Sequence, residues 1–342
     1  MAANASFCPR PSSRSVRFYF YLLKGSGKVS AGAVGDIIAS RKSLSSERSY
    51  SLKDFTYAAP ATLQEASKLL AAANGSAKIL SGGTDIIVQL REGLRDASQV
   101  IDVKKIPELM ELSFSPQHGL RLGAAVPCYC IYENAEIAKA YPALVDSARI
   151  IGGWQIQSRA SIGGNLCNSS PAADSIPSLI AHHAYAEVVG PAGKRKVAVE
   201  SFCTAPGRNV LQPGELLVAL VFPPTMPHSG SAYERFIPRN EMDIAVVGVG
   251  SRVQLNQACD KIEFARIGLA AVAPTPKFAQ EASEWLAGKP PTEETYAQAG
   301  LLAKKVASPI SDMRGPAEYR THLVGVLVKR TRATAGERAM GK

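Results

Sequence analysis

Two glycine-rich segments hold most of the residues in this sequence that could do chemistry. The first is S-R-A-S-I-G-G-N-L-C-N-S-S-P-A-A-D at 158–174, where two adjacent glycines stand among serine, asparagine and aspartate side chains. Glycines leave backbone N–H groups unobstructed, and the short polar side chains add donors and acceptors. Exposed amides in a tight turn form a concave anion site. The segment therefore predicts a loop that binds a phosphate-bearing ligand, and the alternative is a polar surface loop with a glycine turn.

The second segment is K-I-L-S-G-G-T-D-I-I at 78–87. Its apolar start predicts a strand over 78–81, and the pattern after the glycines predicts a helix from Asp85. A junction of this kind presents amides at a helix N-terminus, which suits a pyrophosphate group. The segment lacks both the Lys-Ser or Lys-Thr of a Walker loop and the G-x-G-x-x-G of a Rossmann turn. It therefore indicates a phosphate site of a different class.

In this order, the two segments resemble the FAD-binding medium subunit of the molybdenum hydroxylases, the xanthine dehydrogenase and carbon monoxide dehydrogenase family. The resemblance runs from about residue 51 to about 330. It continues in four further blocks: G-E-L-L-V-A-L-V-F-P at 214–223, S-A-Y-E-R-F at 231–236, R-N-E-M-D-I-A at 239–245 and D-M-R-G-P-A-E-Y-R at 312–320. It implies an α+β fold. A PCMH-type (vanillyl-alcohol-oxidase-like) FAD-binding domain of two subdomains would precede a C-terminal domain with a three-stranded antiparallel sheet and helices.

The resemblance places FAD between the two subdomains and assigns a set of residues to it. These are Ser81, Gly82, Gly83, Thr84, Asp85, Ile86, Ser161, Ile162, Gly163, Gly164, Asn165, Asp174, Leu217 and Arg235. The serines, glycines and their neighbours would surround the pyrophosphate. No histidine or cysteine is placed for covalent attachment, so the flavin is expected to be non-covalently bound.

Several of these residues allow a second interpretation. Asp174 would accept hydrogen bonds from ribityl or ribose hydroxyls, and the alternative is an N-cap of a helix over 176–182. Leu217 would contact the isoalloxazine, or it is a strand core residue. Arg235 stands where xanthine dehydrogenases carry lysine, and the two side chains are not interchangeable at a close contact. Arg239 and Asp243 lie in a segment that the resemblance brings close to the flavin, and the alternative is a surface ion pair.

The resemblance implies an electron-transfer subunit in which FAD acts and no side chain is catalytic. Of the six cysteines only Cys128 and Cys130 are close together, whereas iron–sulfur and zinc sites need clustered thiolates. Molybdopterin and [2Fe–2S] centres would belong to a large and a small partner subunit in a cytoplasmic dimer of heterotrimers. Two alternatives remain: a stand-alone FAD-dependent oxidoreductase of the same fold, and a non-enzymatic assembly subunit that has lost FAD. The sequence identifies neither the substrate nor the terminal acceptor.

The charge distribution argues against a nucleic-acid surface. The chain has 342 residues and a formal net charge of +10. Residues 1–50 carry +6 and residues 329–342 carry +4, so the body between them is neutral. Nucleic-acid-binding proteins instead concentrate basic residues on a folded face. No apolar run is long enough to span a membrane.

Hydrophobic patterns predict the elements that must position these residues. Thr62 and Glu65 form a capping box for a helix over 62–73. The first subdomain, 51–105, would also hold strands at 78–81 and 100–103. The second, 106–226, would hold strands at 119–126, 186–190, 195–199 and 216–222 and helices at 129–139, 142–151 and 176–182. The C-terminal domain, 227–335, would hold strands at 231–237, 244–255 and 261–273 and helices at 276–286, 292–305 and 316–333. Residues 1–50 are expected to be a leader or disordered, and 336–342 a basic tail.

Overall fold

The computed structural model describes residues 52–239 and 241–342. The predicted leader at 1–50 lies outside the described residues. Among the described residues, no helix is both long and apolar enough to cross a membrane. The described chain forms three sheets of three or more strands, which follow one another along the sequence.

The first unit is a small parallel sheet with the order β1-β3-β2. Its strands are β1 (Thr56–Ala58), β2 (Ala77–Leu80) and β3 (Gln99–Asp102), and its helices are α2 (Leu63–Ala72) and α3 (Ile86–Arg91). Thr62 caps α2 by accepting from Glu65 N at 3.2 Å. The Glu65 carboxylate accepts from Ala61 N, one residue before the position expected in a capping box. In the 78–87 segment, β2 precedes the glycine turn and α3 follows it, as the sequence predicts.

The second unit is a five-stranded antiparallel sheet with the order β4-β5-β10-β6-β7. The strands are β4 (Leu112–Ser115), β5 (Gly119–Gly123), β6 (Tyr185–Gly190), β7 (Gly193–Ala198) and β10 (Leu216–Phe222). The central strand β10 is almost wholly buried, which explains its continuous apolar run. A separate pair is formed by β8 (Cys203–Ala205) and β9 (Arg208–Asn209).

Short helices accompany this sheet. They are α4 (Pro107–Met110), α5 (Cys128–Tyr132), α6 (Ala135–Ala140), α7 (Pro142–Ala148), α8 (Trp154–Gln157), α9 (Ile162–Asn168), α10 (Ser175–Ala181) and the 3₁₀ turn η1 (Val199–Ser201). The helix predicted over 129–139 is divided in two. Asn134 interrupts it because its side chain caps α6, accepting from the N–H groups of Glu136 and Ile137.

The C-terminal sheet has four antiparallel strands, so the expected three-stranded sheet is wrong by one strand. The strands are β11 (Ser229–Phe236), β12 (Val247–Leu255), β13 (Ile262–Ala270) and β14 (Lys277–Phe278). The helix predicted from 276 begins only at Gln280. Two residues of the predicted helix, Lys277 and Phe278, form β14 instead and pair with β13. The Arg266 guanidinium lies 3.9 Å from the centre of the Phe278 ring.

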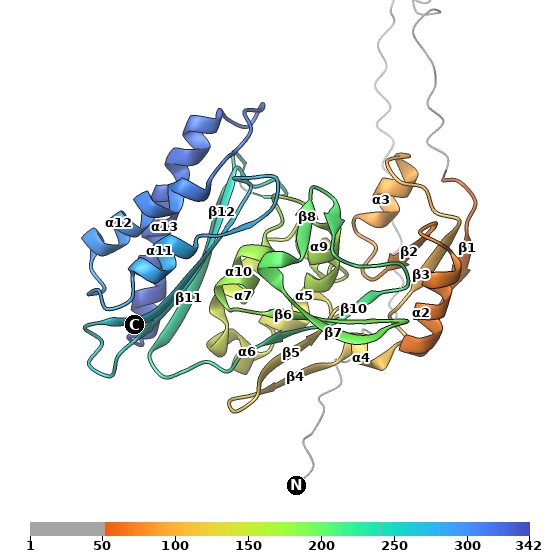
Figure 1. The fold of residues 1–342 in the computed structure, drawn as a ribbon, viewed down its shortest axis with the longest axis horizontal. Helices are drawn as coiled ribbons and strands as arrows, with labels where there is room; N and C mark the ends of the chain where they lie inside the picture. Colours follow the sequence, from red (N-terminus) through yellow and green to blue (C-terminus); the bar gives the residue numbers. More distant parts are fainter. Residues whose placement is uncertain (1–51, 240) are drawn as a thin grey trace, which may run out of the picture.

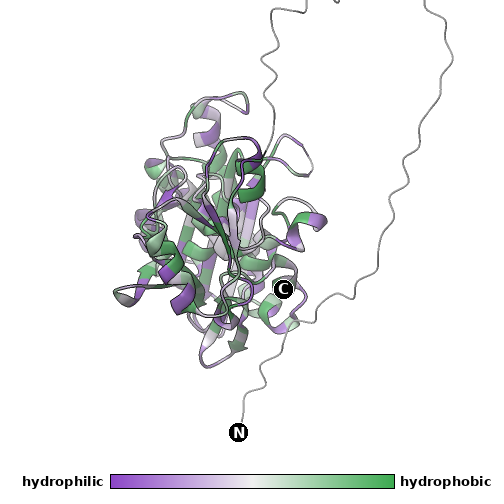
Figure 2. Cartoon of the chain, turned by 90° about the vertical axis from the view of Figure 1, so that its right-hand side faces the viewer, coloured by the Kyte–Doolittle hydropathy of each residue, from purple (hydrophilic) through white to green (hydrophobic). Residues whose placement is uncertain are grey.

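Helices cover both faces of this C-terminal sheet (Figure 1). One face carries the C-terminal helices: α11 (Gln280–Trp285), α12 (Glu293–Ala303), the 3₁₀ turn η2 (Lys304–Val306) and α13 (Ala317–Ala339), which runs six residues beyond its predicted end. Helices α7 and α10 of the second unit pack on the sheet from the other side. In Figure 2 the inner strands are largely hydrophobic, and hydrophilic residues gather on the outer helices and turns.

Two glycines of the C-terminal sheet set the position of α10. A Cβ at Gly250 would lie 2.5 Å from the Pro177 carbonyl oxygen, and one at Gly268 would lie 2.4 Å from the same atom. Only glycine permits such an approach of strand to helix backbone. The start of α10 is thereby held directly against the sheet, which brings Asp174 beside β11.

Candidate cofactor-binding site

A cleft of about 480 Å³ opens between the first two units, and both glycine-rich segments line it. This volume is in the range of small-molecule sites. Most of the residues predicted for the cofactor lie in its wall: Ser81, Gly82, Gly83, Thr84, Asp85, Ile86, Ser161, Gly163, Gly164, Asn165 and Leu217. The structure therefore brings together two segments that lie 80 residues apart in the sequence.

The two segments touch directly at one end of the cleft. Ser81 Oγ lies 2.9 Å from Ser161 Oγ. A Cβ at Gly82 would stand 2.1 Å from the Arg159 carbonyl oxygen, so this glycine is needed for the approach of one segment to the other. Gly83 has a φ of +81°, which allows the turn from β2 towards α3. The first glycine pair therefore builds the junction of the two units.

The loop predicted over 158–174 is wrong in one respect, because residues 162–168 form α9. Ser161 caps this helix by accepting from Gly164 N at 3.1 Å. A Cβ at Gly163 would lie 2.5 Å from the Ala124 carbonyl oxygen, which requires glycine for packing. The low helix propensity of glycine and asparagine hides this helix from the sequence pattern, while the cap and the contact with Ala124 fix it in the fold.

Gly164 differs from its neighbour because a Cβ there would approach side-chain atoms of the two serines and no backbone atom of another segment. A Cβ there would meet Ser161 Oγ at 3.0 Å and Ser81 Cβ at 4.0 Å, with no other atom within 4 Å outside its own helix backbone. The position also lines the cleft. A larger side chain at 164 would fold into the helix but would project between the two segments. This opening, with hydroxyl and amide groups around it, fits a phosphate-bearing cofactor such as FAD.

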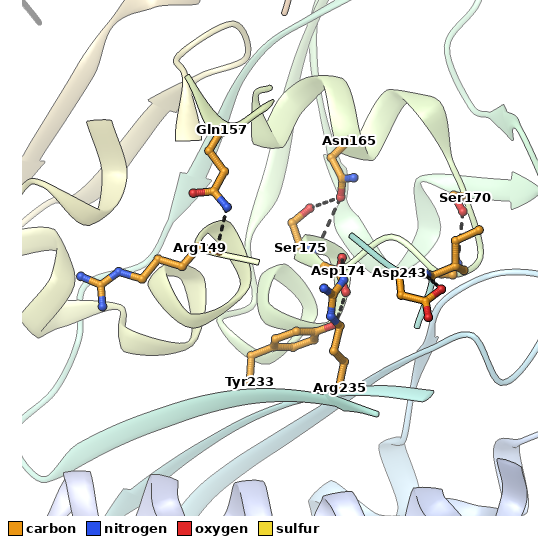
Figure 3. A network of polar contacts seen from close by, with 11 residues as sticks. Arg149, Gln157, Asn165, Ser170, Asp174, Ser175, Tyr233, Arg235 and Asp243 are labelled. Atoms are coloured by element: carbon orange, nitrogen blue, oxygen red, sulfur yellow. Dashed lines mark hydrogen bonds and ion pairs between the residues drawn. The ribbon is translucent and has the colours of Figure 1, made fainter. Parts of the chain in front are cut away.

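Ile162, Asp174 and Arg235 do not line the cleft. Ile162 is buried in the hydrophobic core of the second unit. The carboxylate of Asp174 accepts from Tyr233 Oη at 2.8 Å through Oδ1 and from Arg235 Nη1 at 2.7 Å through Oδ2. Figure 3 shows Tyr233 and Arg235 rising from one strand, β11, towards Asp174. We call Asp174, Tyr233 and Arg235 the carboxylate cluster.

The contacts of the carboxylate cluster bear on the N-cap alternative for Asp174. The residue occupies the N-cap position of α10, but its side chain makes no capping bond. Its carboxylate points to the C-terminal sheet instead, where both side chains of the ion pair with Arg235 are largely buried. Burial raises the pKa of Asp174 to about 6, although Arg235 and the Tyr233 hydroxyl oppose the shift by stabilising the ionised form.

Asn165 joins the cleft wall to the cluster. Its Oδ1 accepts from Ser175 Oγ at 2.6 Å and from Ser175 N at 3.4 Å, and Ser175 directly follows Asp174. The same asparagine lines the cleft. Figure 3 shows Asn165 next to Ser175 on one side of Asp174, and Tyr233 and Arg235 on the other side. Ser175, the neighbour of Asp174, therefore links this part of the chain to α9 through two hydrogen bonds to Asn165.

The remaining predicted residues divide between the two interpretations. Leu217 is 4% exposed and lines the cleft, so it is both a strand core residue and an apolar part of the wall. Arg239 and Asp243 form an ion pair at 3.4 Å (Nε to Oδ2), and the arginine side chain is 69% exposed. The ion pair of the second interpretation is therefore present, with Arg239 exposed and Asp243 largely buried, and a position close to the flavin stays a prediction.

The sequence reasoning missed several polar residues of the site. Gln89, Asn168 and Arg95 line the cleft, and Gln89 Nε2 donates to Asn168 Oδ1 at 3.1 Å. Tyr233 was not singled out, although it precedes Arg235 by two residues. Residues i and i+2 of a strand share one face, and this spacing is the signal that would have found it. Within residues 52–239 and 241–342, no group of three or more His, Cys, Asp or Glu side chains could hold a metal ion.

Comparison with protein families agrees with this geometry. Residues 53–225 match the family described as FAD binding domain in molybdopterin dehydrogenase. Residues 231–335 match the family described as CO dehydrogenase flavoprotein C-terminal domain. The first match alone covers half of the chain, and the two together cover both hydrophobic cores of the described chain except Ala339.

Individual relatives align over nearly their full length. The chain is 32% identical over 288 residues to the xanthine dehydrogenase FAD-binding subunit of Escherichia coli O157:H7, which covers 84% of this chain and 98% of the relative. It is 30% identical over 285 residues to the carbon monoxide dehydrogenase medium chain of Afipia carboxidovorans, with 83% and 98% covered.

Solved structures show the same arrangement. A chain of the reconstituted CO dehydrogenase from Oligotropha carboxidovorans superposes with a TM-score of 0.79 at 29% identity, covering 84% of this chain and 99% of that one. A chain of the quinoline 2-oxidoreductase from Pseudomonas putida 86 gives a TM-score of 0.77 at 28% identity, with 85% and 99% covered. The protein therefore belongs to the FAD-binding subunits of the molybdopterin dehydrogenases, an oxidoreductase family that includes those of xanthine and carbon monoxide dehydrogenase.

Proposed function

We propose that this chain is the electron-transfer subunit of a heterotrimeric molybdenum hydroxylase or dehydrogenase. It would accept electrons from the [2Fe–2S] clusters of a small partner subunit and pass them to an external acceptor. A molybdopterin-binding large subunit would oxidise the substrate. We further propose that the complex is cytoplasmic and is a dimer of such heterotrimers. Family membership supports the proposal, and the cleft between the first two units is the observation that carries it.

Within that cleft, we propose the following roles. The Ser81–Ile86 and Ser161–Asn165 segments bind the diphosphate of FAD from two sides, with Gly164 leaving room for close approach. Ile162, which is buried, would contribute only its backbone. Leu217 packs against the isoalloxazine. Asp174 and Arg235 do not line the cleft, so a hydrogen bond from a ribityl or ribose hydroxyl to Asp174 and a contact of Arg235 with the flavin stay predictions of the family resemblance. The boundaries at 105, 226 and 335 stay predictions.

The chemistry of the subunit comes from the cofactor. FAD can take one or two electrons, so it can link single-electron carriers to two-electron acceptors. The protein itself binds and orients the flavin. Asp85 lines the cleft and has a raised pKa, because the surrounding protein atoms disfavour its charged form. Because an ionised carboxylate would be repelled by phosphate, the Ser81–Ile86 segment would bind the diphosphate through its backbone N–H and hydroxyl groups rather than through the Asp85 carboxylate.

The test is co-expression with the large and small subunits. The isolated chain should oxidise no purine, aldehyde or carbon monoxide, and activity should appear only when all three subunits are present. Transfer of electrons from an artificial donor to a dye by the isolated chain would be compatible with this result. Robust turnover of an organic substrate by the isolated chain would instead support the stand-alone oxidoreductase. Assembly without flavin would support the non-enzymatic subunit.

A further inference from the structure

The carboxylate of Asp174 is held at both oxygens by residues of the C-terminal domain. Tyr233 Oη donates to Oδ1 and Arg235 Nη1 to Oδ2, at 2.8 and 2.7 Å. Two donors on separate oxygens fix the plane of a carboxylate as well as its position. Asp174 itself belongs to the second unit, at the start of α10. One strand of the C-terminal domain therefore sets the orientation of a side chain in the preceding unit.

Tyr233 is well placed to act as a rigid donor. It is 7% exposed, and Gly248 leaves room for its hydroxyl, because a Cβ at 248 would lie 2.6 Å from Tyr233 Oη. Its backbone N–H donates to Asp146 Oδ2 at 3.1 Å. The same carboxylate accepts from Arg338 Nη1 at 2.7 Å. Tyr233 is thus fixed at the junction of α7, β11 and α13.

The orientation of Asp174 matters to the cleft because of the link through its neighbour. Ser175 donates to Asn165, which lines the cleft in the first turn of α9. Gly164, the open position of that wall, directly precedes Asn165. The hydrogen-bonded path from Tyr233 to the cleft is therefore short and lies within largely buried groups.

We propose that Tyr233 is a positioning residue for FAD: its hydroxyl orients the Asp174 carboxylate, and through Ser175 and Asn165 it holds the α9 wall of the cleft. The C-terminal domain thereby contributes to cofactor affinity without lining the cleft. This inference rests on the proposed function, since it assumes that FAD occupies the cleft. Tyr233 acts through Asp174 and does not itself contact the cofactor.

The protonation state of Asp174 provides a direct readout of this role. Among the described residues, Tyr233 and Arg235 of β11 are the titratable and charged groups that shift it, while the α9 side offers the neutral Asn165. Both β11 residues lower the pKa of Asp174, against burial. Loss of the Tyr233 hydroxyl should therefore raise that pKa, and the ionised carboxylate should be lost at a higher pH than in the wild type.

The experiment compares Tyr233→Phe with Tyr141→Phe in the full chain. Tyr141 is a matched control, because it is also buried and its hydroxyl donates at 2.9 Å, but to the Pro223 carbonyl rather than to Asp174. The FAD dissociation constant of each protein is measured from pH 5 to pH 8 with reconstituted apoprotein, together with the thermal midpoint. A third variant carries Asp174→Asn alone, and a fourth carries Asp174→Asn together with Tyr233→Phe.

We expect Tyr233→Phe to weaken FAD binding on the order of tenfold, as for one hydrogen bond to a charged group, and to move the pH midpoint of affinity upward. Tyr141→Phe should change neither quantity. In the Asp174→Asn background the effect of Tyr233→Phe should largely disappear. Equal losses of thermal stability in the two tyrosine variants, with unchanged FAD affinity and pH midpoint, would overturn the inference and leave the proposed function intact. A wild-type chain that binds no FAD would overturn both.

Discussion

Ser81 Oγ lies 2.9 Å from Ser161 Oγ, and this contact joins the two glycine-rich segments across the end of the cleft. Each serine is also tied to its own unit. The Ser81 carbonyl accepts from Lys104 Nζ at 2.9 Å, and the Ser161 hydroxyl accepts from Gly164 N at 3.1 Å. The pair therefore couples the turn after β2 to the first turn of α9.

Ser161→Ala should destabilise the protein because α9 loses its N-cap. The expected loss is about 1 kcal/mol in the free energy of unfolding, the usual cost of removing a capping serine. Ser161→Thr is the control, since threonine also caps and should restore most of the stability. Urea unfolding monitored by circular dichroism measures both. An alanine variant as stable as the wild type would show that the cap contributes nothing to the fold.

The bound flavin should be released completely by acid. Among the residues that the structure describes, Cys167 is the one cysteine in the lining of the cleft, and no histidine is part of that lining. The side chain of Cys167 is half-buried, and burial raises the pKa of its thiol to about 12, which makes it a poor nucleophile. Acid precipitation of the purified protein, followed by absorbance of the supernatant, is the measurement. Flavin that remains with the pellet would refute non-covalent binding.

Asp174 should make the stability of the apoprotein depend on pH in a defined window. Its pKa is about 6 in the folded chain, against an ordinary value of 3.8. The folded state therefore binds more protons between these values, and the free energy of unfolding falls as the pH rises from about 4 to about 6. Asp174→Asn removes this dependence.

The free energy of unfolding is measured for the wild type and for Asp174→Asn at pH 4 and at pH 7, and the change between the two pH values is compared. From pH 4 to pH 7, the free energy of unfolding of the wild type should fall by on the order of 2–3 kcal/mol more than that of Asp174→Asn. Chemical denaturation at each pH gives the values. Parallel pH profiles for the two proteins would show that the pKa of Asp174 is the same in the folded and unfolded chain, which would contradict the raised value.

The sequence predicted the parts of the fold that depend on local signals. Local sequence patterns predict the cap at Thr62, the apolar run of β10 and the turn at Gly82-Gly83, because each depends on residues within a few positions of one another. The order of the glycine-rich segments pointed to the family, and with it to one shared site. These predictions needed no knowledge of long-range contacts.

The remaining features depend on contacts between distant residues. Helix α9 was predicted as a loop because its cap and its packing against Ala124 outweigh the low helix propensity of its glycines. Strand β14 was missed because its two residues extend only beside β13. The bond between Tyr233 and Asp174 joins residues 59 positions apart, and nothing in the local pattern indicates it.

The most direct test of the account is the FAD content of two neighbouring glycine variants. Gly164→Val should fold normally but retain almost no FAD, because its side chain projects between Ser81 and Ser161. Gly163→Ala should instead lower stability by about 1–3 kcal/mol through its clash with Ala124, and it serves as the packing control. The measurement is the ratio of flavin to protein, with circular dichroism to confirm folding. A folded Gly164→Val protein with one FAD per chain would contradict the assignment of the cofactor to this cleft.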